Sequence, residues 1–132
     1  MITERYFFKT VLNIPFAEAV EKARKALATE GFGVLTEIDV KATLKKKLDK
    51  EFRNYIILGA CNPSLAFRTL QAEKQIGLLL PCNVVVQDGV GGTSIVSAIN
   101  PEVAMESVGN PDLAPTADEV SRKLKKVIAS LE

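Results

Sequence analysis

The segments Leu58-Gly-Ala-Cys-Asn-Pro63 and Leu79-Leu-Pro-Cys-Asn-Val84 define the centre of the fold that this sequence predicts. Each joins an apolar run to a cysteine that is followed by asparagine, and each carries a proline beside that pair. Apolar runs of this length, bounded by helix or turn signals, are typical of buried strands. The sequence therefore predicts strands over 55–61 and 77–87, with a bulge or an unpaired edge at Pro81.

Helix and strand signals follow directly after these segments. Asn62 is a good N-cap and Pro63 suits the first helical position, which predicts a helix over 63–73. Residues 93–99 alternate in the manner of a strand and form a hairpin with 77–87. The glycine-rich turn at 88–92 lacks both the phosphate-loop pattern and a following helix, so we interpret it as a plain connection.

The remaining elements are predicted from apolar spacing and from capping residues. Gly31 stands where a left-handed C-cap belongs, and Asp39 is placed to cap a short helix. Thr116 and Glu119 have the spacing of a capping box. The predicted elements are a strand at 6–12, helices at 15–30 and after Asp39, a strand at 32–38, a short helix after Pro101, and a C-terminal helix at about 116–131.

The predicted element order, β-α-β-α-β-α-β-β-α, defines an α+β fold. We expect a single mixed, largely antiparallel sheet that is covered by helices. The chain of 132 residues has the length of one domain and can bury a core without disulfides or metal. We therefore expect residues 1–132 to form a single domain.

Charge and hydropathy exclude several classes of partner. Lysine and arginine number 17 against 16 acidic residues, so no overall positive field favours nucleic acid. The lysines that follow Asp39 have no stacking aromatics among them and are interpreted as a solvated helix face. No apolar run is long enough to span a membrane, and no signal peptide is recognisable. We expect a cytoplasmic protein with neither a nucleic-acid nor a membrane partner.

The chain contains no histidine. This composition excludes Ser-His and Cys-His nucleophile pairs and most zinc or iron sites. In a reducing compartment the two cysteines are expected to be free thiols. Cys61 precedes a helix N-cap, where the positive end of the helix dipole favours a thiolate.

A candidate site follows if the helix at 63–73 is a crossover between two parallel neighbouring strands. The two cysteines would then lie at a similar level of the sheet, with the amides of Asn62 and Asn83 beside them. Asn83 stands in a very apolar segment, so its amide should have a definite partner. Glu37 is the nearest acidic candidate. The predicted ligand-binding residues are Cys61, Asn62, Cys82, Asn83 and Glu37.

Other interpretations of these residues remain open. Both cysteines are explained equally well as small buried hydrophobes, and Asn62 as a helix cap. As metal ligands, Cys61 and Cys82 supply only two soft donors per chain. Two thiolates suit copper(I), whereas structural zinc would need both subunits of a dimer.

Three long motifs resemble the domain-of-unknown-function 302 family. They begin at Glu30, Tyr55 and Gly77, and the resemblance covers about residues 5–107, leaving the C-terminal helix outside the core. It implies a small bacterial or archaeal α+β domain, homodimeric and without assigned activity. Relatives often carry histidine after the position of Ala66, where this chain has Phe67, so a histidine-assisted role is not implied here.

Three functions are compatible with these observations. The first is a homodimeric binding or sensing module, whose Cys/Asn-lined site holds a small molecule or a soft metal. The second is a structural or interaction domain with buried cysteines. The third is an enzyme that uses Cys61 as a thiolate nucleophile, with Glu37, Asp39 or a lysine as the base. No cofactor and no catalytic residue are specified by the sequence.

Overall fold

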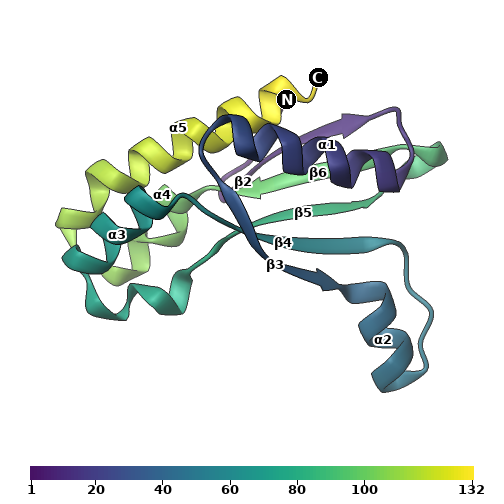
Figure 1. Ribbon diagram of the computed structural model, residues 1–132, viewed down its shortest axis with the longest axis horizontal. Coiled ribbons are helices and arrows are strands. Elements are labelled where there is room, and N and C mark those ends of the chain that lie inside the picture. Colours follow the sequence, from purple (N-terminus) through teal and green to yellow (C-terminus); the bar gives the residue numbers. More distant parts are fainter.

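The computed structural model describes residues 1–132 and contains one six-stranded sheet (Figure 1). The strand order is β1-β2-β6-β5-β4-β3, and every neighbouring pair is antiparallel. The strands are β1 (Ile2–Thr3), β2 (Phe7–Leu12), β3 (Gly33–Asp39), β4 (Tyr55–Cys61), β5 (Cys82–Asp88) and β6 (Ser94–Ile99).

Helices occupy the connections between the strands and the C-terminus. They are α1 (Phe16–Thr29), α2 (Val40–Leu48), α3 (Pro63–Ala72), α4 (Pro101–Ala104) and α5 (Ala114–Ser130), with 3₁₀ turns η1 (Lys74–Leu79), η2 (Val90–Gly92), η3 (Glu106–Val108) and η4 (Pro111–Leu113). In Figure 1, α3 and α4 lie at one end of the molecule and α2 at the other. None of the helices could cross a membrane, because none is both long and apolar enough.

The core lies between α1, α5 and one face of the sheet. Alternate strand residues point into it, among them Phe8, Leu58 and Val84, all fully buried. The apolar stripes of the two long helices cover this face, with Leu27 from α1 and Leu124 from α5 fully buried. The helices therefore pack on one face only.

The opposite face of the sheet is not covered by any element of the chain. It carries the other half of each strand's residues, which are mostly apolar. The cross-strand register places on this open face Phe7, Lys9, Val11, Ile38, Tyr55, Ile57, Asn83, Val85, Gln87, Ile95, Ser97 and Ile99. The lysine-rich helix α2 has no buried residue, and its predicted lysine face is exposed.

Much of the predicted fold is confirmed. The α+β class is as expected, and the hairpin joins β5 to β6. The Asp39 carboxylate caps α2 by accepting from the Ala42 N–H at 2.9 Å. Gly31 has a φ of 82°, in the left-handed region expected after α1.

Three expectations were wrong. The strand expected from residue 77 begins only at Cys82, because the preceding apolar residues form η1 and cover the end of α3. Strands β4 and β5 are antiparallel, so α3 is not a crossover between parallel neighbours. The last helix begins at Ala114, directly after η4, so Thr116 lies inside α5 and forms no capping box.

Candidate functional site: a pocket lined by two thiols

A pocket of about 250 Å³ lies where β4 ends, α3 begins and η1 leads into β5. We call it the thiol pocket. Of its 14 lining residues, 11 are hydrophobic, so its wall is mainly apolar. The lining residues are Phe32, Leu35, Ala60, Cys61, Asn62, Leu65, Ala66, Thr69, Leu70, Leu80, Pro81, Cys82, Met105 and Val120.

The pairing of β4 with β5 brings the two cysteines to this pocket. Ala60 is the direct cross-strand partner of Cys82, and Cys61 is the next residue along β4. Regular alternation would point Cys61 to the opposite face, but β4 ends there and the chain turns into α3. Both thiols are free, Cys82 buried and Cys61 half-buried.

Burial governs the chemistry of Cys82. Burial, together with a smaller contribution from the negative charge of an ionised Cys61, raises the pKa of the Cys82 thiol from 9.0 to about 11. Cys82 is therefore a neutral thiol at physiological pH. Cys61 is the thiol that solvent and small molecules can reach.

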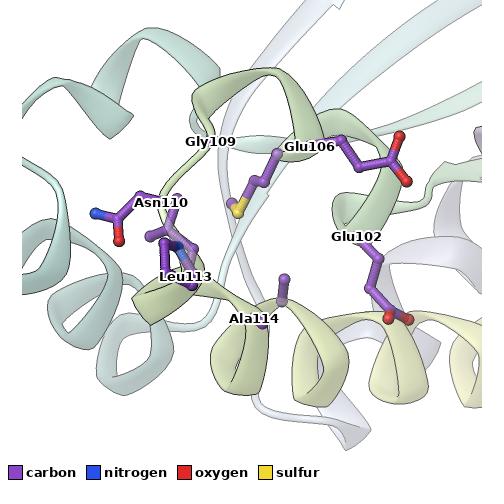
Figure 2. Close-up of a pocket in the computed structure, with 9 residues that line it drawn as sticks. Glu102, Glu106, Gly109, Asn110, Leu113 and Ala114 are labelled. Atoms are coloured by element: carbon purple, nitrogen blue, oxygen red, sulfur yellow. The ribbon is translucent and has the colours of Figure 1, made fainter.

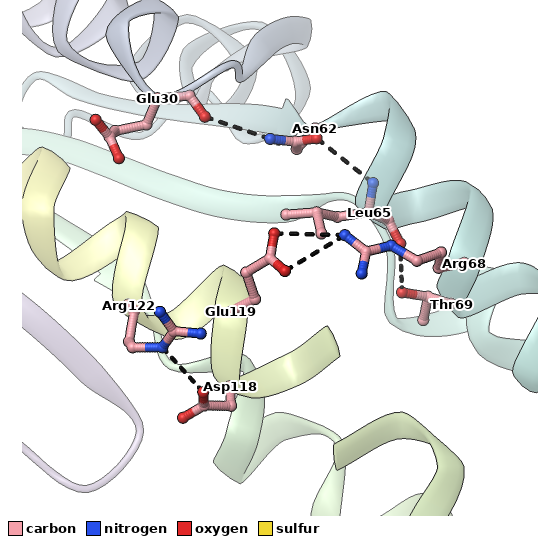
Figure 3. Close-up of polar contacts among 8 residues, drawn as sticks. All are labelled: Glu30, Asn62, Leu65, Arg68, Thr69, Asp118, Glu119 and Arg122. Carbon is pink, nitrogen blue, oxygen red and sulfur yellow. Dashed lines mark hydrogen bonds and ion pairs between the residues drawn. The ribbon is translucent and has the colours of Figure 1, made fainter. Parts of the chain in front are cut away.

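Asn62 serves as a structural clamp at the pocket wall (Figure 3). Its side-chain oxygen accepts from the Leu65 N–H at 3.4 Å and caps α3. Its amide group donates to the Glu30 carbonyl at 3.3 Å, which ties the end of α1 to the start of α3. Both ends of the amide are therefore engaged, and Asn62 positions the wall of the pocket.

The second polar residue of the wall is also internally satisfied. The Thr69 hydroxyl donates to the Leu65 carbonyl at 2.8 Å and is buried (Figure 3). No buried side-chain nitrogen or oxygen in the structure lacks a hydrogen-bond partner. The polar chemistry that remains available to a ligand is that of the sulfur atoms.

The rim of the pocket is apolar and exposed. Leu35, at a register shift between β3 and β4, is 68% exposed, and Leu70 of α3 is 44% exposed. Exposed leucines at the mouth of an apolar pocket are typical of a site that a ligand or partner covers. The rim therefore favours binding of an apolar group.

Two of the predicted site residues lie elsewhere. Asn83 points from β5 to the open face of the sheet and is exposed, so the prediction of an internal partner for its amide was wrong. Glu37 forms an ion pair with Arg24 at 2.7 Å and does not line the pocket. The structure brings together Cys61, Asn62 and Cys82.

The sequence did not indicate several residues of the wall. Met105, at the C-terminal end of α4, and Leu80 and Pro81, before β5, line the pocket together with Val120 of α5. Only the packing of α3, α4 and α5 against one another places these residues together. No local pattern in the chain predicts that packing.

A second pocket, of about 360 Å³, lies beside the first and shares Met105 with it. Figure 2 shows the carboxylates of Glu102 and Glu106 on one side of this pocket and the Asn110 amide on the other. Glu106 pairs with Arg5 at 3.0 Å, and the Asn110 amide donates to the Ala72 carbonyl at 3.0 Å. The Glu106 carboxylate and the Asn110 amide therefore serve contacts within the chain.

The sheet, its single helical layer and the pocket at the β4–α3 junction define a small α+β domain with a mainly apolar cleft. The chain belongs to the family described as Domain of unknown function DUF302, whose model matches residues 8–131. This range extends through α5, beyond the 5–107 span of the motifs.

A solved structure shares the fold closely. The crystal structure of an uncharacterized conserved DUF302 protein from Bacillus stearothermophilus has a TM-score of 0.89 and 26% sequence identity. The alignment covers 98% of this chain and 100% of that one. The search of curated proteins found no match to the chain.

Proposed function

We propose that this protein is a binding module whose thiol pocket holds a small, neutral and mainly apolar molecule. The observation that supports this proposal is the composition of the wall, in which 11 of 14 residues are hydrophobic. The wall contains no charged side chain, so a charged organic molecule would lose hydration without gaining an ion-pair partner. Affinity would come from apolar burial, at roughly 25 cal/mol per Å².

The experiment is an amide chemical-shift titration with 1-octanol as the probe. We expect shifts confined to residues around the thiol pocket, because a flexible eight-carbon chain can enter it and bury against Leu65, Leu80 and Val120. Saturation of these shifts would give the affinity. An absence of shifts up to the solubility limit of octanol would contradict the proposal.

A matched pair of variants locates the binding. Ala66→Phe fills the pocket from α3, whereas Ser64→Phe adds the same ring to an exposed position of the same helix that does not line the pocket. We expect octanol binding to be lost in Ala66→Phe and kept in Ser64→Phe. Equal binding by both variants would place the octanol site elsewhere.

We further propose that the module is a homodimer formed through the open face of the sheet. This face is mostly apolar, and its charged side chains are Lys9 and, at the edge, Arg53, which bonds Gln87 and lies over Tyr55, so a second copy could cover its centre with little charge repulsion. The sheet is roughly 24 Å wide and 20 Å long, from strand spacing and rise. This outline of roughly 480 Å² is smaller than the roughly 800 Å² per partner of a standard interface, so the side chains that stand out from the sheet must supply the rest of the contact area.

The oligomeric state tests this second proposal. Light scattering after size exclusion should give twice the chain mass of 14.3 kDa for the wild type. Val85→Lys should give a monomer, because it places a charge at the centre of the face. Lys46→Glu, on the exposed face of α2, should leave the dimer intact. A monomeric wild type would overturn the proposal.

A further inference from the structure

Sulfur is concentrated in the thiol pocket. The chain has two cysteines and two methionines. Three of these four residues, Cys61, Cys82 and Met105, line the same pocket. The fourth is Met1, at the N-terminus.

The donor set of this pocket is soft. None of the lining residues is an aspartate, a glutamate or a histidine. Nowhere in the chain do three or more histidine, cysteine, aspartate or glutamate side chains come together in a group that could hold a metal ion. Thiolate and thioether sulfur favour copper(I), whereas magnesium and calcium require oxygen ligands. Structural zinc usually takes four ligands, more than two thiolates can supply.

The three sulfur-bearing side chains reach the pocket from two directions. Cys61 and Cys82 come from neighbouring strands, which lie roughly 4.8 Å apart. Both cysteines line the same pocket at the end of this strand pair. Met105 approaches from the end of α4 and forms part of the wall between the two pockets.

We propose that the thiol pocket binds one copper(I) ion through the sulfurs of Cys61, Cys82 and Met105. The inference rests on the proposed binding role of this pocket, and it adds a metal ion held by the sulfur atoms to the apolar molecule held by the wall. Binding replaces the S–H bond of each thiol with an S–Cu bond and releases two protons to solvent, while copper stays in the +1 state. The resulting site has one net negative charge, beside the positive N-terminal end of α3.

The test is an anaerobic titration of the purified protein with copper(I), in competition with the chromophoric chelator bicinchoninate. We expect one copper(I) per chain. Cys61→Ser and Cys82→Ser should each weaken binding by about 100-fold or more, because each removes a thiolate ligand. Met105→Leu should weaken it by roughly 10-fold, because the thioether is a weaker ligand and leucine preserves the apolar volume.

A control variant separates copper binding from binding of a small apolar molecule. Leu35→Ala removes an apolar rim residue without sulfur, so it should weaken octanol binding and lower copper(I) affinity far less than Cys61→Ser does. Met105→Leu should weaken copper(I) binding more than octanol binding, because leucine lacks the sulfur but keeps the apolar volume. If octanol fails to bind but copper(I) binds with the expected variant effects, only the proposal of an apolar ligand is overturned.

Copper K-edge X-ray absorption provides a readout that does not depend on the folding of the cysteine variants. We expect three sulfur ligands in the wild type and two in Met105→Leu. Oxygen or nitrogen ligation in the wild type would overturn the copper site. So would a wild-type affinity equal to that of the Cys61→Ser/Cys82→Ser double variant.

Discussion

Cys61 lies one residue beyond Ala60, the direct cross-strand partner of Cys82, and both thiols line one pocket. A helix and a 3₁₀ turn separate the two cysteines in sequence, and antiparallel pairing brings them together. The same junction holds the cap of α3 and the close approach of β3, β4 and the residues before β5. The stability of this junction and its chemistry can therefore be tested with a few substitutions.

Gly59 allows the close packing that shapes the junction. A Cβ atom at this position would lie 2.1 Å from the Thr36 hydroxyl oxygen and 2.8 Å from the Pro81 side chain. We expect Gly59→Ala to lower the free energy of unfolding by about 1–3 kcal/mol, the usual cost of overpacking. Urea denaturation followed by circular dichroism measures this difference.

Gly33 provides the control for Gly59→Ala. It lies in β3, opposite Cys61, and a Cβ atom there would meet nothing within 4 Å. Gly33→Ala should change the stability by less than about 0.5 kcal/mol. Equal losses of stability in the two variants would show that the contact with Thr36 and Pro81 is not the cause of the loss in Gly59→Ala.

Asn62 should contribute measurably to stability through its two hydrogen bonds. Asn62→Ala removes the cap of α3 and the bond to the Glu30 carbonyl, at an expected cost of about 1–2 kcal/mol. Asn62→Asp keeps the acceptor for the Leu65 N–H but loses the donor, so it should retain part of that stability. Thermal or urea unfolding of both variants tests this order, and an alanine variant as stable as the wild type would contradict it.

The titration of Cys82 should make the protein less stable at alkaline pH. The folded state holds the pKa of this thiol at about 11, above its ordinary value of 9.0, so folding favours the neutral thiol. This contribution is complete below pH 9 and is lost as the pH rises towards 11. A shift of two pKa units corresponds to about 2–3 kcal/mol of the free energy of unfolding.

The difference between the wild type and Cys82→Ala isolates this effect from the titration of lysines and tyrosines. The free energy of unfolding of the wild type should fall more steeply between pH 9 and 11 than that of Cys82→Ala. Parallel pH profiles would show that Cys82 titrates with an unshifted pKa. Urea denaturation at each pH supplies the values.

Local signals predicted most of the elements of this fold. Asp39 and Asn62 cap helices as their side chains predict, and Gly31 has the left-handed backbone that its position after α1 requires. The α+β class followed from the order of these elements. These features depend on contacts between residues that are close in sequence.

The sequence was a poorer guide where distant contacts decide the structure. The apolar residues before Cys82 have the composition of a buried strand, but where they pack against α3 they form the 3₁₀ turn η1. Apolar neighbours on both sides made Asn83 look buried, yet its face of the sheet has no helical cover. Met105 joined the site through the packing of α4, which no spacing in the sequence specifies.

The most direct test of the thiol pocket as a binding site is the rate at which iodoacetamide alkylates Cys61 in a Cys82→Ala background, with and without 1-octanol. Cys61 lines the pocket and is half-buried, so an occupant of the pocket should block access to its sulfur. We predict that the rate falls in step with octanol occupancy and recovers when octanol is removed. An alkylation rate that octanol leaves unchanged would contradict the account.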